Sequence, residues 1–260
     1  MFSESCDKLR GKEVMEVRMR KRHNLAPRME RCAEYLIDNP AENRGHWKNG
    51  DRPLLLEIGC GKGSFTCALA RQRPDSEIIA MEKVPDVMIL AMERAKMMGL
   101  TNVRFLDYDA AGLRDVFDRG EVDRIFLNFS DPWPKSRDAK FRLTAPAFLR
   151  SYADVLPTGG EVRLKTDNRP LFEWSLKQFH EENWELRKLT FDLHAEGQRG
   201  ILTDYEMRFL QNGIPICGLI AVRTEHTLNS SAGMPPRLRD AALSDARGAK
   251  AESEGKEQNL

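Results

Sequence analysis

Residues 54–63 read LLLEIGCGKG, and they give the clearest indication of the fold class. Its first half is a short apolar run that ends at Gly59, which is typical of a buried strand. Its second half is a glycine-rich turn, and glycines let a backbone turn sharply and approach a ligand where a Cβ would collide. The stretch therefore predicts a strand that leads into a ligand-binding turn.

The region around this turn alternates strand-like and helix-like patterns. We expect strands at 54–58, 78–81, 103–106, 124–129, 161–165, 184–191 and 216–222, the last two as a closing antiparallel pair. We expect helices at 64–71, 84–98, 143–156 and 171–183. The alternation predicts an α/β fold with a doubly wound, mainly parallel seven-stranded sheet and helices on both faces. Ligands of such folds bind outside the carboxyl ends of the strands, so residues at those ends are the candidates for a site.

Acidic residues stand at three of these strand ends. Glu57 lies two residues before Gly59, Glu82 ends the second strand, and Asp109 follows the third. The glycine spacing is G-x-G-x-G and differs from the G-x-G-x-x-G of dinucleotide-binding folds, although the turn alone does not exclude a dehydrogenase. A carboxylate beside the turn disfavours a pyrophosphate and favours a sulfonium cofactor with an ammonium group. Glu82 can then accept hydrogen bonds from ribose hydroxyls, and Asp109 from an adenine amine.

This set of residues resembles the class I S-adenosylmethionine-dependent methyltransferases. The alternative interpretation is a tight strand-to-helix turn with carboxylates on the surface, and for Glu82 alone this alternative is competitive.

The fourth strand end carries the segment NFSDPWPK, residues 128–135. Two prolines fix φ on either side of Trp133, so the loop is stiff and presents the Asp131 carboxylate together with a large aromatic plane. Four cations between residues 135 and 142 stand against one acid, Asp138. A cationic run beside a rigid aromatic loop favours contact with an RNA backbone next to base recognition. By itself, the run would be typical of a solvated helix start.

This segment, with the basic cluster behind it, closely resembles the bacterial tRNA (guanine-N7)-methyltransferases, which modify the guanine at position 46 in the variable loop of tRNA. The resemblance covers about residues 18–223, and DPWPK at 131–135 is its most specific part. It also includes KTDN at 165–168 and TDYE at 203–206. The resemblance implies S-adenosylmethionine as the cofactor and tRNA as the substrate.

The resemblance further implies roles for single residues. The implied cofactor contacts are Glu57, Gly59, Glu82, Asp109 and Asp131, and Asp131 is also the implied catalytic residue. The implied tRNA contacts are Lys135, Arg137, Lys140, Arg142, Asp167, Thr203, Tyr205 and Glu206. The basic cluster departs from the family pattern, because Asp138 stands where His is common and Phe141 stands where Arg is usual. Asp167 or Glu206 can instead be a capping or salt-bridging residue.

The chemistry of guanine suggests what the carboxylates do. N7 is an unprotonated acceptor, so its lone pair can attack a sulfonium methyl group without a general base. Methylation leaves positive charge on the purine, and nearby anions stabilise that charge. Asp131, Asp167 or Glu206 can also accept hydrogen bonds from guanine N1–H and N2–H₂ and so select guanine over adenine. We therefore expect catalysis by in-line positioning, with Asp131 acting through orientation and electrostatics and not as a proton acceptor.

Composition sets limits on the rest of the chain. The 260 residues carry 41 Lys+Arg against 40 Asp+Glu, a net charge of +1, which excludes a uniformly basic nucleic-acid binder but allows local basic patches. Residues 8–31 hold nine Lys/Arg against three Glu, and we expect residues 1–50 to form a basic N-terminal arm and helix. Residues 51–226 are the predicted methyltransferase domain. Residues 227–260 are poor in large apolar groups, so we expect a disordered tail.

Some kinds of site and location are disfavoured. Five cysteines without a C-x-x-C pair and five histidines without ligand spacing predict no metal site, and we expect His194 in a surface loop. A charged start without an apolar segment indicates no secretory signal, and the apolar run 216–222 is too short to cross a bilayer. We therefore expect a cytoplasmic protein with no membrane partner. The oligomeric state, monomer or homodimer, stays open.

Competing functions stay open as well. The same cofactor can serve methylation of another RNA, of DNA or of a protein amide, because a loop of acid, proline and aromatic residue also suits a planar amide group. A noncatalytic RNA-binding subunit is a further alternative. The carboxylates of Glu57, Glu82, Asp109 and Asp131 count against it, because a pure binding module needs no cofactor site.

Overall fold

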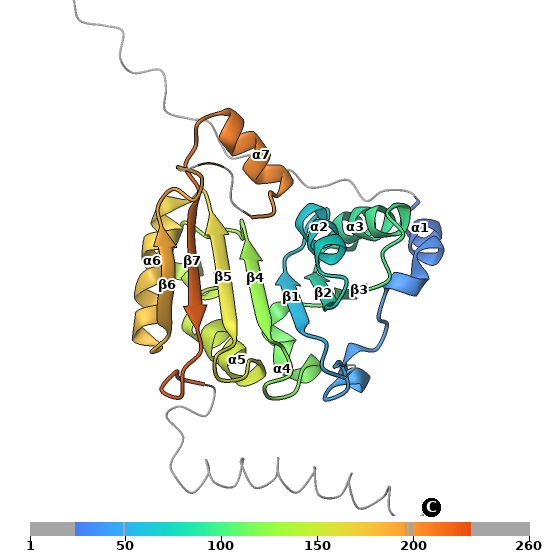
Figure 1. Cartoon of the computed structure of the whole chain (residues 1–260), viewed down its shortest axis with the longest axis horizontal. Coiled ribbons are helices and arrows are strands. Elements are labelled where there is room, and N and C mark those ends of the chain that lie inside the picture. Colours follow the sequence, from blue (N-terminus) through green and yellow to red (C-terminus); the bar gives the residue numbers. More distant parts are fainter. Residues whose placement is uncertain (1–23, 49, 196, 198–199, 230–260) are drawn as a thin grey trace, which may run out of the picture.

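A seven-stranded sheet, with strand order β3-β2-β1-β4-β5-β7-β6, forms the centre of the protein (Figure 1). The computed structural model describes residues 24–48, 50–195, 197 and 200–229. The strands are β1 Leu54–Ile58, β2 Glu77–Glu82, β3 Val103–Asp107, β4 Arg124–Asn128, β5 Glu161–Thr166, β6 Glu185–Thr190 and β7 Cys217–Val222. Neighbouring strands are parallel except that β7 runs antiparallel to β5 and β6. The predicted doubly wound sheet and its closing antiparallel pair are confirmed. Residues 1–23 of the expected arm and residues 230–260 of the expected tail lie outside the described residues.

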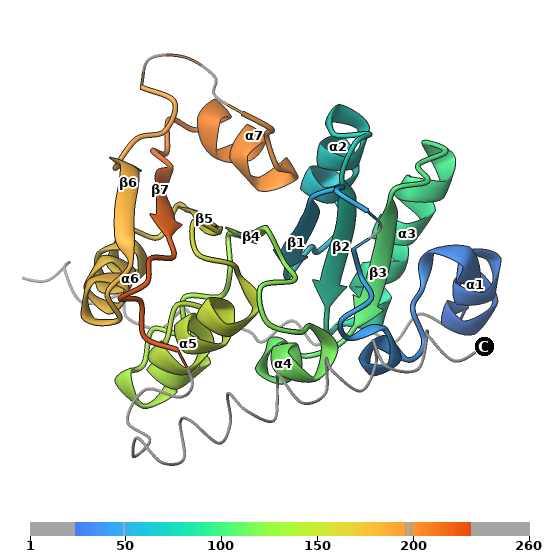
Figure 2. The same cartoon turned by 60° about the horizontal axis from the view of Figure 1, so that its bottom comes forward.

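Helices cover both faces of the sheet (Figures 1 and 2). They are α1 Leu25–Arg31, α2 Ser64–Gln72, α3 Pro85–Met97, α4 Leu113–Val116, α5 Pro146–Val155, α6 Arg169–Glu181 and α7 Asp204–Gln211. The helices α2 and α3 pack over β1, β2 and β3 on one face, with α1 against α3, and α4, α5 and α6 pack on the other face. Among the described residues, no helix combines the length and apolar character that a membrane crossing requires.

The central position of β1 in the sheet explains why four of its five residues are apolar. Leu54 and Leu56 belong to the core under α4, α5 and α6, whereas Leu55 belongs to the core under α2 and α3. All five residues of β1 are buried, since both faces of the sheet are covered. Glu57 shares the face of Leu55, because side chains alternate along a strand, and this places its carboxylate beside α2.

The observed helices begin at local capping signals, which the predicted ranges did not take into account. The helix predicted at 143–156 begins at Pro146, which occupies the first turn, where a missing N–H costs nothing. The helix predicted at 171–183 begins at Arg169, because the Asn168 side chain accepts the N–H of Leu171 as a cap. The helix α7, between the last two strands, was not predicted, although Thr203 and Glu206 form a capping box at its start.

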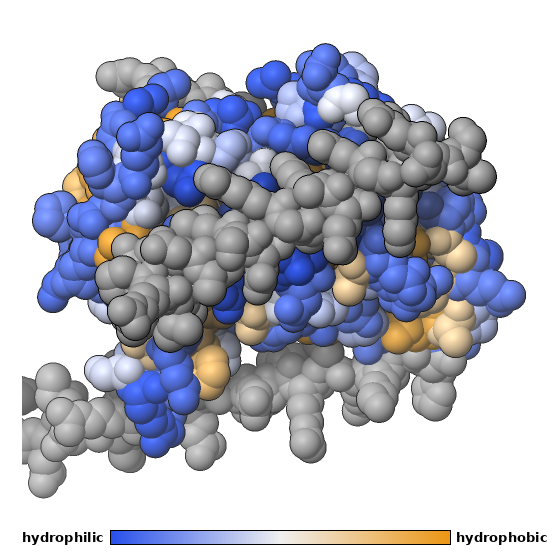
Figure 3. All heavy atoms as spheres, turned by 90° about the horizontal axis from the view of Figure 1, so that it is seen from below, coloured by the Kyte–Doolittle hydropathy of each residue, from blue (hydrophilic) through white to orange (hydrophobic). Residues whose placement is uncertain are grey.

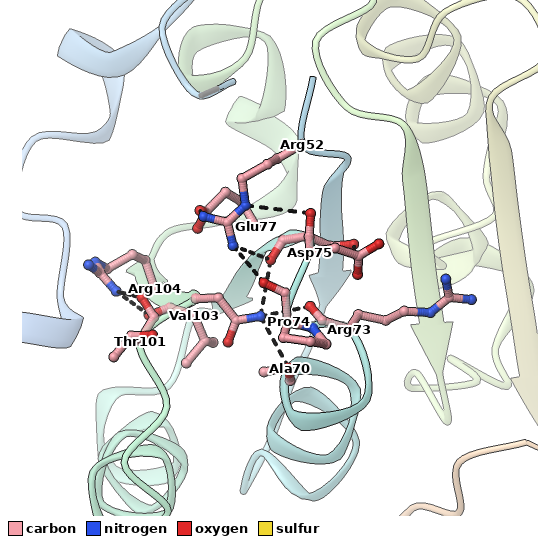
Figure 4. Close-up of polar contacts among 11 residues, drawn as sticks. Arg52, Ala70, Arg73, Pro74, Asp75, Glu77, Thr101, Val103 and Arg104 are labelled. Carbon is pink, nitrogen blue, oxygen red and sulfur yellow. Dashed lines mark hydrogen bonds and ion pairs between the residues drawn. The ribbon is translucent and has the colours of Figure 1, made fainter. Parts of the chain in front are cut away.

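Side chains also fix the loop between α2 and β2, at the amino end of the parallel strands (Figure 4). Asn102 Nδ2 donates to the carbonyls of Ala70, Arg73 and Ser76 at 3.1, 2.8 and 3.0 Å. Arg52 contacts the same loop and forms an ion pair with Glu77 at 2.6 Å. Where described residues are visible from below, the surface is mainly hydrophilic with small apolar patches (Figure 3). These contacts stabilise the scaffold, and the candidate site lies at the opposite edge.

Candidate functional site

A cavity of about 950 Å³ opens at the carboxyl ends of β1, β2 and β4. It brings together the expected cofactor residues and part of the expected substrate set. These lining residues are Glu57, Gly59, Glu82, Asp109 and Asp131, together with Thr203 and Tyr205. The other expected tRNA contacts, all within the described part of the chain, lie outside the lining. They are Lys135, Arg137, Lys140, Arg142, Asp167 and Glu206.

Glu57 is a buried carboxyl group at the inner wall of this cavity, only 2% exposed. The Thr66 hydroxyl donates to one of its oxygens, and Asn128 Nδ2 donates to the other at 2.9 Å. Burial raises the pKa of Glu57 to about 7, although both hydrogen bonds act in the opposite direction. A cation beside it would restore its charge, so the position suits a positively charged ligand group. Sequence reasoning missed Thr66 and Asn128 as partners of Glu57. For Asn128 a signal existed, because it is a polar residue at the end of the otherwise apolar strand β4.

The glycine turn has two different reasons for its glycines. Gly59 and Gly61 have φ of +76° and +57°, and a Cβ on either residue would meet no atom within 4 Å. Their backbone conformation, and not crowding, therefore requires glycine, and the space beside them is open to a ligand. Gly63 has φ of +71°, and a Cβ there would lie 2.5 Å from the Cβ of Ala91. Gly63 thus lets α2 begin against α3.

Glu82 and Asp109 are the acidic groups at the ends of β2 and β3. The main-chain N–H groups of Gly61 and Val84 each donate to the Glu82 carboxylate at 3.1 Å. A carboxylate has about four lone-pair sites, so Glu82 can still accept two ligand hydroxyls. Asp109 is exposed and accepts the N–H of Ala111 at 2.9 Å, which fixes the side chain and leaves acceptor capacity. Both are placed as hydrogen-bond acceptors for a ligand.

The loop after β4 is held in a strained conformation. Phe129 and Trp133 have φ of 55° and 42°, and such left-handed non-glycine residues cost about 1–3 kcal/mol each. Arg142 Nε donates to the Pro132 carbonyl at 3.0 Å, and its Nη2 donates to the Trp133 carbonyl at 2.9 Å. Its guanidinium also lies 4.4 Å from the centre of the Trp174 ring. Arg142 therefore holds this loop in place, and its expected contact with tRNA stays a prediction.

Aromatic side chains surround the exposed Asp131 at the mouth of the cavity. Tyr205 is 59% exposed and stacks nearly parallel to Phe129, with ring centres 6.1 Å apart. Trp133 packs against Phe141, with ring centres 5.3 Å apart. Phe141, which departs from the family pattern, thus extends the aromatic surface of the loop. The mouth combines flat apolar faces with a carboxylate, which suits a purine base.

Cations lie around this mouth on more elements than the sequence suggested. The expected side chains of Lys135, Arg137 and Lys140 are exposed on the segment after the loop. Sequence reasoning missed three further exposed cations that line the cavity: Lys62, Lys83 and Arg208. Lys62 is inside the glycine turn and Lys83 directly follows Glu82. Both could have been predicted from the sequence, because each is next to a residue already expected in the site.

Thr203 and Glu206 belong to a buried polar cluster. The Thr203 hydroxyl accepts the Glu206 N–H, and Glu206 Oε2 accepts the Thr203 N–H at 2.8 Å. Glu206 is fully buried, and its Oε1 contacts Lys165 Nζ at 2.9 Å and His194 Nε2 at 3.3 Å. Of the two roles left open, Glu206 thus has the capping and salt-bridging one, and its oxygens are not available to a base. His194 is 9% exposed, so its expected place in a surface loop was wrong, whereas Asp167 is exposed beyond β5.

The cavity fits S-adenosylmethionine, the cofactor that this fold implies. Open space beside Gly59 and Gly61 admits a ligand to the backbone. The buried Glu57 suits a cationic group, Glu82 retains acceptor sites for ribose hydroxyls, and the exposed Asp109 can accept an adenine amine. Among the described residues, no group of three or more His, Cys, Asp or Glu side chains is placed to hold a metal ion.

Comparison with known proteins agrees with this description of the fold and cavity. A family model described as "Putative methyltransferase" matches residues 51–219. The crystal structure of the 16S rRNA methyltransferase KamB has the same fold, with a TM-score of 0.53 and 18% identity over 70% of this chain and 91% of that one. The protein is a Rossmann-like class I methyltransferase that uses S-adenosylmethionine as its methyl donor.

Relatives in sequence define the family more narrowly. The tRNA (guanine-N(7)-)-methyltransferase of Bacillus velezensis is 45% identical over 188 residues, which are 71% of this chain and 87% of that protein. The protein of the same name from Bacillus subtilis is 44% identical over 71% of this chain and 88% of its own length. The protein of the same name from Streptococcus agalactiae is 40% identical over 76% of this chain and 95% of its own length. The chain belongs to the tRNA (guanine-N(7)-)-methyltransferase family.

Proposed function

We propose that this protein transfers the methyl group of S-adenosylmethionine to N7 of a guanine in tRNA, and that this guanine is the one at position 46. The observation that carries the proposal is one cavity in which the acidic cofactor residues meet the loop of Asp131 and Trp133. Identities of 40–45% with proteins named for this activity support the reaction type. Position 46 rests on the resemblance of residues 131–135 and the basic cluster to the bacterial enzymes. We also propose a cytoplasmic location, where the tRNA substrate is present.

The cofactor half of the cavity offers a group for each polar part of the ligand. Glu57 would face the cationic amino-acid end, Glu82 would accept the ribose hydroxyls, and Asp109 would accept the adenine amine. When bound, the cofactor supplies an electrophilic methyl group on a sulfonium sulfur. The turn at Gly59 allows the main chain to approach the ligand without a Cβ in between.

The acceptor half favours positioning over proton transfer. Guanine N7 carries a free lone pair, so no group in the site has to remove a proton from it. Asp131 is exposed at the mouth, next to the aromatic faces of Trp133 and Tyr205, and can accept hydrogen bonds from the guanine edge. Its charge also stabilises the positive charge that methylation leaves on the purine. Asp131 is therefore the proposed catalytic residue, through orientation and electrostatics.

The exposed cations supply the contacts for the RNA backbone. Lys135, Arg137 and Lys140 follow the loop directly, and Lys62, Lys83 and Arg208 stand on other sides of the mouth. Phosphates bound by these groups would hold the nucleotide over an otherwise acidic cavity. Asp167 and Thr203 remain proposed substrate contacts beside them.

A methyl-transfer assay tests the proposal. The protein is incubated with radiolabelled S-adenosylmethionine and an unmodified tRNA transcript, and the nucleosides are then separated. We expect label in 7-methylguanosine, and we expect it to disappear in a transcript with adenine at position 46. Label in another nucleoside refutes the reaction, and label that persists in the altered transcript refutes the position.

The Asp131→Asn variant tests the proposed role of the carboxylate. We expect turnover to fall by about 10-fold to 1,000-fold while cofactor affinity changes little, because the charge is removed and the shape is kept. The pH dependence of the remaining activity should match that of the wild type, since no proton is abstracted. Unchanged turnover would exclude an electrostatic role for Asp131.

A noncatalytic RNA-binding subunit is the competing function of a different class. It predicts tRNA binding without label transfer and without calorimetric binding of S-adenosylmethionine. An RNA, DNA or protein acceptor other than tRNA predicts label transfer only to that acceptor, and the same assay separates these outcomes.

A further inference from the structure

The helix α7 contributes Tyr205 and Arg208 to the cavity, yet its buried residue is a glutamate. Met207 and Leu210 are exposed, so the helix buries no broad apolar face against the protein. Figure 1 shows α7 beside the carboxyl ends of β4 and β5. A helix with few buried apolar groups belongs to the less stable part of a structure. Phe129 stacks on Tyr205 and Phe209 of α7, and the buried polar contacts of Glu206 hold the first turn of the helix.

Lys165, near the end of β5, supplies the central polar contact. Its Nζ donates to Glu206 Oε1 at 2.9 Å and to the carbonyl of Ile201 at 2.9 Å. The lysine side chain is 17% exposed and that of the glutamate 0%, so the ion pair is largely removed from water. One ammonium group thereby holds both the segment before α7 and its first turn against the sheet.

Other contacts of α7 are more exposed. Arg94 forms an ion pair with Asp204 at 3.4 Å, with both side chains about one-third exposed. The Asp204 N–H donates to the Ser64 hydroxyl at 3.1 Å. Exposed ion pairs stabilise little, whereas removing one partner of a buried pair leaves an unpaired charge. His194 Nε2 also contacts Glu206 Oε1, at the longer distance of 3.3 Å.

We propose that Lys165 is a positioning residue for the acceptor nucleotide, because its contact with Glu206 keeps Tyr205 and Arg208 at the cavity mouth. Lys165 itself lies outside the lining of the cavity, although its Nζ is 5.8 Å from the ring centre of Phe65, which does line it. We assign the effect of Lys165 to α7, and Glu206→Gln, which keeps the lysine beside Phe65, separates the two contacts. The nucleotide part of this inference rests on the proposed function. The structural part, the attachment of α7, does not.

The test compares Lys165→Met with a matched variant, Arg150→Met. Arg150 pairs with Glu182 at 2.8 Å, and the glutamate side chain is 5% exposed, so this variant also breaks an ion pair to a buried carboxylate. That pair joins α5 to the end of α6, and neither residue lines the cavity. Three quantities are measured: amide hydrogen exchange in residues 203–210 without ligands, calorimetric affinity for S-adenosylmethionine, and KM with kcat for tRNA.

For Lys165→Met we expect exchange in α7 to be at least about 10-fold faster and the KM for tRNA to rise about 10-fold. Affinity for S-adenosylmethionine should stay within about threefold, and Lys165→Arg should restore most of the loss. Arg150→Met should leave α7 exchange and KM unchanged. Unchanged exchange in Lys165→Met, or the same changes in Arg150→Met, would overturn the proposal.

A second variant covers the case in which Lys165→Met does not fold. Glu206→Gln keeps the capping box, which accepts glutamine, and removes the ion pair. We expect the same direction of change in exchange and KM, and unchanged values overturn the proposal here too. Wild-type protein that places no label in 7-methylguanosine would refute the proposed function, whereas the exchange measurement, made without tRNA, decides the role of Lys165 independently.

Discussion

Replacing Glu57 by Gln should remove a pH-dependent loss of stability that the cavity imposes on the cofactor-free protein. Glu57 is 2% exposed, and its two oxygens accept from Thr66 and Asn128. A glutamine fits the same place, because its oxygen can accept from Asn128 and its amide can donate to the Thr66 hydroxyl. The substitution therefore removes the titration without leaving an empty space.

The magnitude follows from the pKa of Glu57, which burial raises from 4.5 to about 7. Below pH 4.5 the carboxyl is protonated in both states, and above pH 7 it is ionised in both. Between these values the unfolded chain has lost the proton and the folded chain keeps it, so the free energy of unfolding falls as pH rises. One unit of pKa corresponds to about 1.4 kcal/mol, so this carboxyl lowers stability by about 3 kcal/mol across the interval.

Urea unfolding of wild type and Glu57→Gln, from about pH 5 to about pH 8, measures this contribution. Other groups titrate in both proteins, so the difference between the two curves isolates Glu57. We expect the variant to gain about 2–3 kcal/mol relative to wild type as pH rises through this range. Parallel curves would show that Glu57 is not held protonated by burial, and the account of its role in the cavity would fail.

Two further substitutions test the turn and the cationic mouth. Gly63→Ala should lower the free energy of unfolding by about 3 kcal/mol, because its Cβ would lie 2.5 Å from that of Ala91 at a φ of +71°. Gly99→Ala, at φ +62° with no atom within 4 Å, should cost only about 1 kcal/mol, and equal losses in urea unfolding would refute the packing argument. Arg208→Ala should raise the KM for tRNA and reduce the slope of log affinity against log salt by about 1, because one phosphate contact is lost. Lys177→Ala, whose side chain is 72% exposed on α6, is the control and should change neither value.

The fold could be predicted because its signals are local. An apolar run such as 54–58 has to be a strand buried on both faces, and the alternation with helical patterns requires crossovers between parallel strands. The helix α7 escaped this reasoning because its apolar residues do not mark its buried face. Its exposed Met207 and Leu210, together with the buried Glu206, reverse the usual order of polar and apolar positions. The local signal that did exist was the capping box at Thr203.

The candidate site could be predicted only as far as its strand ends. Glu57, Glu82 and Asp109 come together because parallel strands end at one edge of the sheet, which the topology alone dictates. The fate of Arg142 and Glu206 depends on partners far along the chain, such as Trp174 for the arginine and Lys165 for the glutamate. Spacing in the sequence does not distinguish an arginine that binds RNA from one that holds a loop.

The features that lower stability lie together at the site. Burial disfavours the charge on Glu57, and the left-handed conformations of Phe129 and Trp133 are unfavourable for residues with side chains. A cationic ligand beside Glu57 would lower its pKa again, because an opposite charge stabilises the ionised form. The free energy that burial of Glu57 costs the empty protein at neutral pH would then be recovered on binding, in addition to the contacts that the ligand makes. Cofactor binding should therefore stabilise the wild type more at pH above 7 than the Glu57→Gln variant, since only the wild type has this charge to neutralise.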